Sequence, residues 1–168
     1  MRRTLRPGHP DDHRLTRPAH AERPGPSCRP PTTVVTTTAS DAHVWNLVYL
    51  ELLLTEWGHH VVNLGPCVPD GLLVHRCLAV RPDLLVVSSV NGHGRDEGQR
   101  LISRVRARPE LAALPAVIGG KLDTGAGDRA RSAAELLAAG FDLVVDEAEG
   151  LEPLRAFAMA AVGTGEAP

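Results

Sequence analysis

The chain has 168 residues, which is enough for one domain with a hydrophobic core of ordinary size. It is 43% hydrophobic but only 3% aromatic, so the core must consist mainly of Leu, Val and Ala. The formal net charge of −2 argues against a dedicated nucleic-acid binder or membrane-surface binder.

The first 31 residues have a composition of their own, with seven arginines, seven prolines and almost no apolar side chains. Such a segment cannot bury enough surface to offset the entropy lost on ordering, so we expect 1–31 to be a disordered tail. A transit peptide suits the arginines but not the prolines, which break an amphipathic helix, and a start codon assigned too far upstream explains the segment as well. We expect one folded domain at 32–163 and a disordered C-terminus at 164–168.

Neither membrane nor disulfide signals are present in the sequence. No apolar run reaches the roughly 18 residues that a spanning helix needs, and no hydrophobic segment follows the basic start as in a signal peptide. Cys28, Cys67 and Cys77 are odd in number and lack paired spacing. They are typical of reduced thiols in a cytoplasmic protein, not of a disulfide framework or a zinc site.

From residue 32 onward, strand and helix signals alternate. Runs of β-branched or apolar residues predict five strands, and apolar residues at helical spacing predict a helix after each. In chain order we expect a strand at 32–38, a helix at 44–57, a strand at 60–65, a helix at 70–81, a strand at 83–90, a helix at 97–108, a strand at 115–120, a helix at 128–140, a strand at 141–146 and a helix at 151–162.

Five strand–helix units with strands this apolar indicate an α/β fold with an open parallel sheet covered by helices on both faces. At this size we expect the flavodoxin-like (Rossmann-like), doubly wound, five-stranded sheet with strand order 2-1-3-4-5. In such folds ligands bind beyond the carboxyl ends of the strands where the order reverses, so the loops after strands 1, 3 and 4 should form the site.

These three loops carry polar residues and glycines. After the first strand, Asp41 precedes His43 by two residues, close enough for the carboxylate to orient the imidazole as a metal ligand or general base. The third strand ends in Ser88 and Ser89 before a glycine-containing loop, and the fourth ends in Gly119 and Gly120. Glycines let a bulky ligand approach the backbone, so the site is expected to hold something large.

The motifs resemble those of a known family. Asp41-x-His43, Ser88-x-Val90 and Gly119-Gly120 look like the Asp-x-His-x-x-Gly, Ser-x-Leu and Gly-Gly signature of domains that bind cobalamin (vitamin B12) in its base-off, His-on form. The stretches VVNLG at 61–65 and VSSVNGHG at 87–94 resemble the small-subunit family of glutamate (methylaspartate) mutase. The resemblance covers roughly residues 32–160 and implies the flavodoxin-like fold.

The resemblance also implies roles. His43 would be the lower axial ligand of cobalt, and Asp41 would accept a hydrogen bond from its other ring nitrogen. The nucleotide tail would enter a slot between strands 1 and 3, where Ser88 would hydrogen-bond its base and the two glycines would leave room. The implied cofactor-binding set is Asp41, Ala42, His43, Val44, Asn46, Ser88, Val90, Gly92, Gly119 and Gly120.

Asn46 departs from the family pattern, which has glycine at this position. Asn is the side chain that best tolerates a left-handed backbone, so a turn there could survive the change. Its bulk would press on the cofactor or alter the start of the following helix. Val90 in place of Leu removes little apolar volume.

The family comparison implies an isomerase subunit that binds adenosylcobalamin and works as a heteromer with a separate, large, barrel-type catalytic subunit. That family's reaction interconverts L-glutamate and threo-3-methylaspartate. The alternative is a diverged, non-catalytic cobalamin carrier or sensor. A receiver domain would need Asp at the end of strand 3 and Lys after strand 5, where this chain has Ser88, Ser89 and Asp146. A flavodoxin would need aromatic residues in the later loops, and none is found there.

Overall fold

The computed structural model describes residues 29–124, 129–146 and 150–163. Most of the predicted tail at 1–31, and the whole predicted C-terminal segment at 164–168, lie outside these residues. The described part of the tail includes Arg29, whose guanidinium donates to Thr32 Oγ1 at 3.0 Å and pairs with Asp83 at 3.2 Å. None of the described helices is both long and apolar enough to cross a bilayer.

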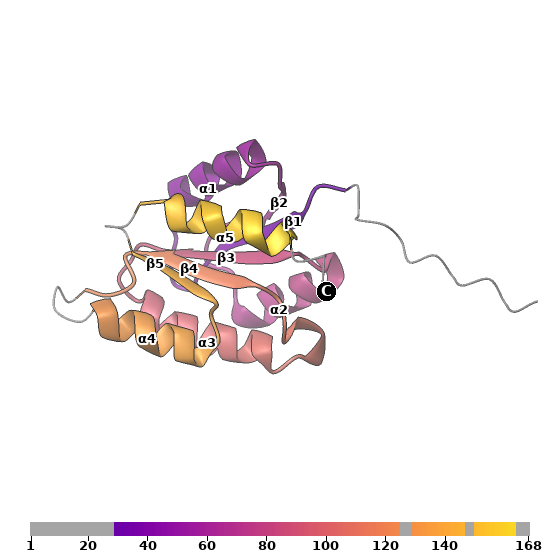
Figure 1. The fold of residues 1–168 in the computed structure, drawn as a ribbon. Helices are drawn as coiled ribbons and strands as arrows, with labels where there is room; N and C mark the ends of the chain where they lie inside the picture. Colours follow the sequence, from indigo (N-terminus) through magenta and orange to yellow (C-terminus); the bar gives the residue numbers. More distant parts are fainter. Residues whose placement is uncertain (1–28, 125–128, 147–149, 164–168) are drawn as a thin grey trace, which may run out of the picture.

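Strands and helices alternate along the chain as predicted (Figure 1). The elements are β1 (Thr32–Thr37), α1 (Trp45–Glu56), β2 (His60–Asn63), α2 (Asp70–Val80), β3 (Leu84–Ser89), α3 (Gly94–Arg106), a 3-10 turn η1 (Pro109–Leu111), β4 (Ala116–Gly120), α4 (Arg129–Ala139), β5 (Leu143–Asp146) and α5 (Glu152–Gly163). All strand pairs are parallel and the order is β2-β1-β3-β4-β5, which confirms the predicted flavodoxin-like topology.

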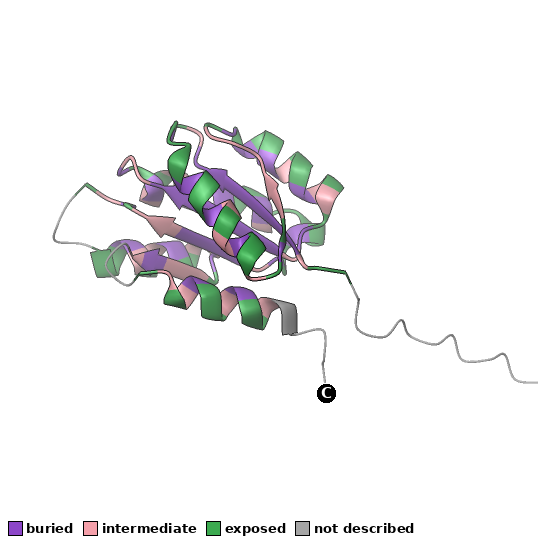
Figure 2. Ribbon diagram, turned by 90° about the horizontal axis from the view of Figure 1, so that it is seen from above, coloured by how far each residue is buried: buried purple, intermediate pink, exposed green. Residues whose placement is uncertain are grey.

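The sheet separates two hydrophobic clusters. Alternate residues of each strand point to opposite faces: Val34, Leu85 and Val87 join the cluster under α2, α3 and α4, whereas Val35 and Val86 join the cluster under α1 and α5. Figure 1 shows α1 and α5 on one side of the sheet and the other three helices on the opposite side. In Figure 2 the central strands are buried, while the helices mix buried and exposed residues.

The start of α3 differs from the sequence prediction. We expected the helix to begin at residue 97, but it begins at Gly94. Arg95 N–H donates to Leu122 O at 3.0 Å, which fixes the first turn against the loop after β4. A Cβ at Gly94 would lie 2.7 Å from Leu122 Cδ2 and 2.9 Å from Ser89 Cβ, so this close approach of helix to sheet requires glycine.

Candidate functional site

The carboxyl ends of β1, β3, β4 and β5 meet at one edge of the sheet. The register pairs Thr37 with Ser88, Ser88 with Gly119, and Gly119 with Val145. The three sequence motifs are therefore brought together, because the loops that carry them leave the sheet side by side. This is the edge at which the sequence predicts the site.

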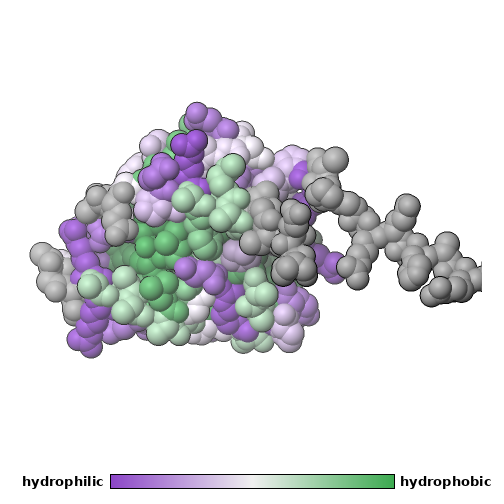
Figure 3. Space-filling model, viewed as in Figure 1, coloured by the Kyte–Doolittle hydropathy of each residue, from purple (hydrophilic) through white to green (hydrophobic). Residues whose placement is uncertain are grey.

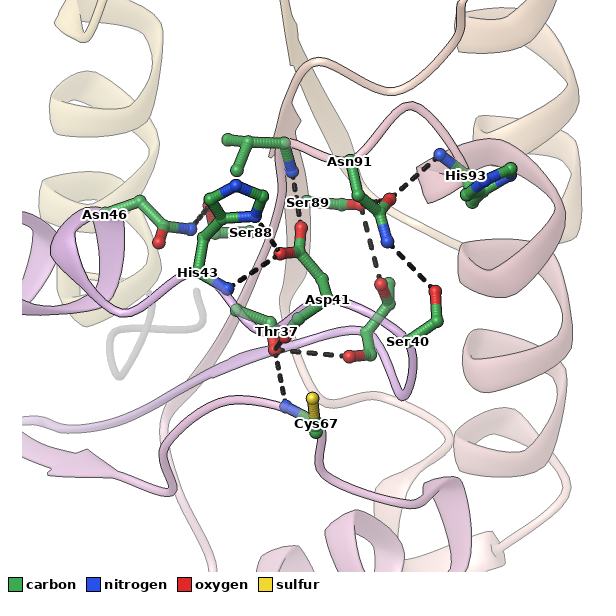
Figure 4. Close-up of polar contacts among 12 residues, drawn as sticks. Thr37, Ser40, Asp41, His43, Asn46, Cys67, Ser88, Ser89, Asn91 and His93 are labelled. Carbon is green, nitrogen blue, oxygen red and sulfur yellow. Dashed lines mark hydrogen bonds and ion pairs between the residues drawn. The ribbon is translucent and has the colours of Figure 1, made fainter.

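Asp41 orients His43 as the sequence spacing predicts (Figure 4). Asp41 Oδ1 accepts from the backbone N–H of His43 at 3.0 Å and lies 2.7 Å from His43 Nδ1. Asp41 Oδ2 accepts from the backbone N–H of Val90 at 2.6 Å. The carboxylate therefore fixes both the backbone and the ring of His43 and ties them to the end of β3.

The surroundings of Asp41 keep it ionised, and this decides which tautomer of His43 faces it. Asp41 is fully buried, which by itself would raise its pKa, but the hydrogen bonds from Val90 and His43 outweigh the burial and lower the pKa. An ionised carboxylate only accepts hydrogen bonds, so His43 Nδ1 carries the proton and donates it. In the neutral form of this half-exposed imidazole the lone pair is then on Nε2, the nitrogen that a metal ion would use.

A second polar network, which the sequence reasoning missed, holds the β1–α1 loop against α3. Ser40 Oγ donates to Glu97 Oε2 at 2.8 Å and accepts from Asn91 Nδ2 at 2.9 Å. Asn91 Oδ1 in turn accepts from Ser89 Oγ at 3.2 Å and from the backbone N–H of His93 at 2.9 Å. Glu97 of α3 thus fixes the loop that carries Asp41 and His43.

Beside His43 a cavity of about 470 Å³ opens between α1 and α5, above the carboxyl ends of β3, β4 and β5. The slot for a nucleotide tail between strands 1 and 3 stays a prediction; α1 packs over β1, and this cavity lies above the neighbouring strands. The lining residues are His43, Trp45, Asn46, Tyr49, Leu50, Val86, Val87, Ser88, Val90, Val117, Gly119, Gly120, Lys121, Val145, Asp146, Gly150, Leu151 and Leu154.

Six of the ten predicted cofactor-binding residues line this cavity: His43, Asn46, Ser88, Val90, Gly119 and Gly120. Asp41 is buried behind His43, and Ala42 and Val44 are exposed beside it. Gly92 lies in the adjoining loop and is not among the cavity-lining residues; its N–H donates to Lys121 O at 3.2 Å, and a Cβ there would meet Thr124 Cγ2 at 2.5 Å.

Asn46 does not adopt the left-handed turn that the sequence reasoning allowed for. It is the second residue of α1, and the positive-φ residues other than glycine in the described chain are Cys67 and Arg81. Its side chain is 5% exposed and points to the sheet, where Nδ2 donates to Ser88 Oγ at 2.6 Å. Helix α1 therefore starts before this position, and the carboxamide forms part of the cavity wall.

The two glycines of β4 have a structural reason that the sequence alone does not supply. A Cβ at Gly119 would lie 3.0 Å from Val145 O, and one at Gly120 would lie 2.5 Å from Ser89 O. Gly120 also has a φ of +105°, which L side chains rarely adopt. Both glycines let β4 approach its neighbours closely, whether or not a ligand also needs the space.

The donor set suits a metal ion that brings most of its own ligands. In residues 29–124, 129–146 and 150–163, no three His, Cys, Asp or Glu side chains gather to hold a bare ion. His43 offers one oriented ring nitrogen at the mouth of the cavity. A corrin ring supplies four nitrogens to cobalt, so one oriented imidazole beside a cavity of ligand size fits such a group.

Comparisons with known proteins agree with this geometry. The B12 binding domain family matches residues 31–156. The glutamate mutase sigma subunit 1 of Haloarcula marismortui is 30% identical over 132 residues, which cover 75% of this chain and 85% of that protein.

Solved structures share the fold. A cobalamin-binding protein from Desulfitobacterium hafniense is 19% identical with a TM-score of 0.61, over 76% of this chain and 59% of that one. The methanol:cobalamin methyltransferase complex MtaBC from Methanosarcina barkeri is 18% identical with a TM-score of 0.61, over 79% of this chain and 46% of that one. This chain thus spans less than two thirds of either.

A signal receiver domain from Syntrophus aciditrophicus reaches the same TM-score of 0.61 at 15% identity, over 82% of this chain and 94% of that one, so the fold alone does not separate the families. The site residues do separate them. A receiver domain needs Asp at the end of β3 and Lys after β5, whereas here β3 ends in Ser88 and Ser89 and β5 ends in Asp146. With its family match over most of the described domain, the chain belongs to the B12 binding domain family and is related to the sigma subunit of glutamate mutase.

Proposed function

We propose that this chain is the cobalamin-binding subunit of an adenosylcobalamin-dependent carbon-skeleton mutase similar to glutamate mutase. The observation that carries the proposal is the Asp41–His43 pair, whose ring lies at the mouth of the cavity with Nδ1 bonded at 2.7 Å to a buried carboxylate. The relationship to a glutamate mutase sigma subunit supports the mutase class.

In this function the chain binds and orients, and the cofactor supplies homolytic radical chemistry when bound. His43 Nε2 would hold the cobalt, and Asp41 would fix the tautomer and the orientation of the ring. The cavity wall, built mainly from Val and Leu side chains, would exclude water from the nucleotide tail. Ser88 is buried and lines this cavity with its hydroxyl-bearing side chain.

The substrate-binding residues would lie in a separate catalytic subunit. L-Glutamate and 3-methylaspartate are dicarboxylates, which ordinarily need converging cationic groups. Lys121 is the cationic side chain among the residues that line the described cavity, and it is exposed. We therefore assign substrate selection to a separate, barrel-type partner subunit.

An exposed apolar surface next to His43 offers that partner a docking face. Large apolar residues of α1 and the residue before it are exposed: Val44, Trp45, Val48, Tyr49 and Leu52. Met159 of α5 is also 56% exposed. Figure 3 shows apolar residues gathered beside α5 and towards β4 and β5, with hydrophilic residues at the margins. Exposed apolar area of this kind marks interaction sites, and its continuity with the cofactor site suits a subunit that must reach the cofactor.

Cofactor retention tests the proposal. The purified chain is mixed with hydroxocobalamin, desalted and examined by absorbance, beside His43→Ala and a matched His75→Ala control, whose histidine is exposed on α2. We expect the wild type and the control to retain a base-off spectrum and His43→Ala to lose or change it. Identical spectra for all three proteins would contradict the assignment of His43.

A second assay addresses the mutase class. The chain loaded with adenosylcobalamin is mixed with the barrel subunit of a glutamate mutase, and 3-methylaspartate is followed by its conversion to glutamate. Activity that needs both chains supports the proposal. Tight cofactor binding without activity for any partner of this class would instead favour a carrier or sensor.

A further inference from the structure

The carboxamide of Asn46 is only half satisfied. Nδ2 donates to Ser88 Oγ at 2.6 Å, but the buried Oδ1 has no hydrogen-bond partner in the described part of the chain. An acceptor buried without a donor is disfavoured, and such groups in native proteins ordinarily have a reason. Since Asn46 lines the cavity, that reason can be a ligand.

Few other groups in the depth of the cavity can form hydrogen bonds. The wall around Asn46 and Ser88 consists mostly of aliphatic side chains: Leu50, Val86, Val87, Val117, Val145 and Leu154. Lys121 is exposed and Asp146 half-buried, so the charged lining residues are the more open ones. A ligand that reaches the buried end of the cavity therefore meets the polar groups of Asn46 and Ser88 in an apolar surrounding. There a hydrogen-bonding group left without a partner costs more free energy than it does in water.

The bases that occur in the tails of cobamides differ in what they offer this pair. Dimethylbenzimidazole has one free ring nitrogen, which accepts, two methyl groups and no N–H donor. Adenine carries an amino group that donates beside ring nitrogens that accept. A carboxamide pairs with that edge through two hydrogen bonds, as Asn does with adenine in DNA recognition. Only the second base gives Asn46 Oδ1 a donor.

We propose that Asn46, together with Ser88, makes the cavity selective for a cobamide whose tail carries an amino-purine base over one that carries dimethylbenzimidazole. The inference rests on the proposed function, because it requires the tail to enter this cavity. It also gives a role to the position at which the family pattern has glycine, a residue that offers no side-chain hydrogen bond.

The test compares two cobamides, hydroxocobalamin and its counterpart with adenine as the base. Dissociation constants are measured by calorimetric titration for the wild type, Asn46→Gly and Asn46→Ala. Asn63→Ala is the matched control, since its carboxamide bonds Glu51 and Gly65 at the end of β2, outside the cavity. Circular dichroism confirms the fold of each variant.

The readout is the change in the ratio of the two dissociation constants between proteins, because the free cobamides also differ in how tightly their own base binds cobalt. We expect the preference for the adenine form to fall on the order of tenfold in both Asn46 variants and to persist in Asn63→Ala. A ratio that stays within about twofold of wild type in both variants would overturn the inference and leave the cobalamin function standing. If neither cobamide binds the wild type, both proposals fail.

Discussion

Asp41 accepts a hydrogen bond at 2.6 Å from the backbone N–H of Val90, which lies 49 residues further along the chain. The other oxygen of the same carboxylate fixes His43. One buried group thus joins the loop after β1 to the end of β3 and sets the direction of the imidazole. Positioning of the ring and cohesion of the two loops therefore depend on the same side chain.

Asp41→Asn should weaken both the positioning of the His43 ring and the attachment of the β1–α1 loop to the end of β3. The amide has the same shape but presents one acceptor in place of two, so it cannot accept from Val90 and His43 together. We expect cobalamin affinity to fall about 10–100-fold, as for other residues that buttress a ligating His, and the free energy of unfolding to drop by about 1–3 kcal/mol. Titration and urea denaturation measure the two effects. Ser103→Ala, which removes an exposed hydrogen bond to Gln99 O on α3 outside the cavity, is the control and should leave the spectrum of the bound cofactor unchanged. Unchanged affinity in Asp41→Asn would show that the buttress has no role.

Gly119→Ala and Gly120→Ala should destabilise the chain even without cofactor. The added methyl groups would meet backbone atoms of Val145 and Ser89, which belong to neighbouring strands and cannot easily move. We expect losses of about 1–3 kcal/mol in the free energy of unfolding, with the larger loss at Gly120 because of its positive φ. Gly71→Ala is the control, since Gly71 lies in α2 with no atom within 4 Å of the new methyl group, and it should be neutral or stabilising by up to about 1 kcal/mol. Equal urea midpoints for all three variants would contradict this account.

The sequence was sufficient to predict the strand order and the meeting of the three motifs. Both follow from the alternation of apolar strands and helices and from the rule that ligands bind at the carboxyl edge of a parallel sheet. The Asp41–His43 contact was predictable too, because two residues separate the partners and little freedom is left between them.

The position of the cavity and the role of Asn46 could not be predicted from the sequence. Both depend on how α1 lies across β1, which is a matter of packing and not of spacing. The contacts of Ser40 with Asn91 and Glu97 were missed for a related reason: nothing in a single sequence shows which polar residues of two distant loops will face each other. The glycine pair was identified, but the close approach of β3 and β5 that requires it appears only in the register.

His59 should make stability depend on pH. It is 4% exposed, with Nδ1 at 2.7 Å from Thr33 Oγ1 and Nε2 unpartnered in the described chain. Burial lowers the pKa of His59 below 6.5, although the carboxylate of Asp83 opposes the shift. As the pH falls, His59 is therefore protonated in the unfolded chain before it is protonated in the folded one. The stability that the neutral, buried His59 contributes is complete above its unfolded pKa of about 6.5. It is lost as the pH falls from there towards the lower pKa of the folded state.

Urea midpoints of the wild type and His59→Asn, measured between about pH 8 and pH 5, test this expectation. The variant should lose less stability on acidification, because its amide does not titrate in this range. The difference between the two curves isolates His59 from the other titrating groups. Parallel curves would contradict the assignment.

The two described cysteines should react very differently with an alkylating agent. Cys67 is exposed in the loop between β2 and α2, whereas Cys77 is fully buried in α2, and burial raises the pKa of its thiol to about 11. At pH 8 only about one in a thousand Cys77 thiols would be ionised, and only the thiolate attacks iodoacetamide. Tryptic mass mapping should therefore find Cys67 alkylated in the native protein and Cys77 alkylated only in urea. Cys67→Ser serves as the control, since removing the reactive thiol should not direct labelling to Cys77. Equal native rates at the two positions would mean that α2 opens on the time scale of the labelling, and that the core beneath it is less stable than its packing indicates.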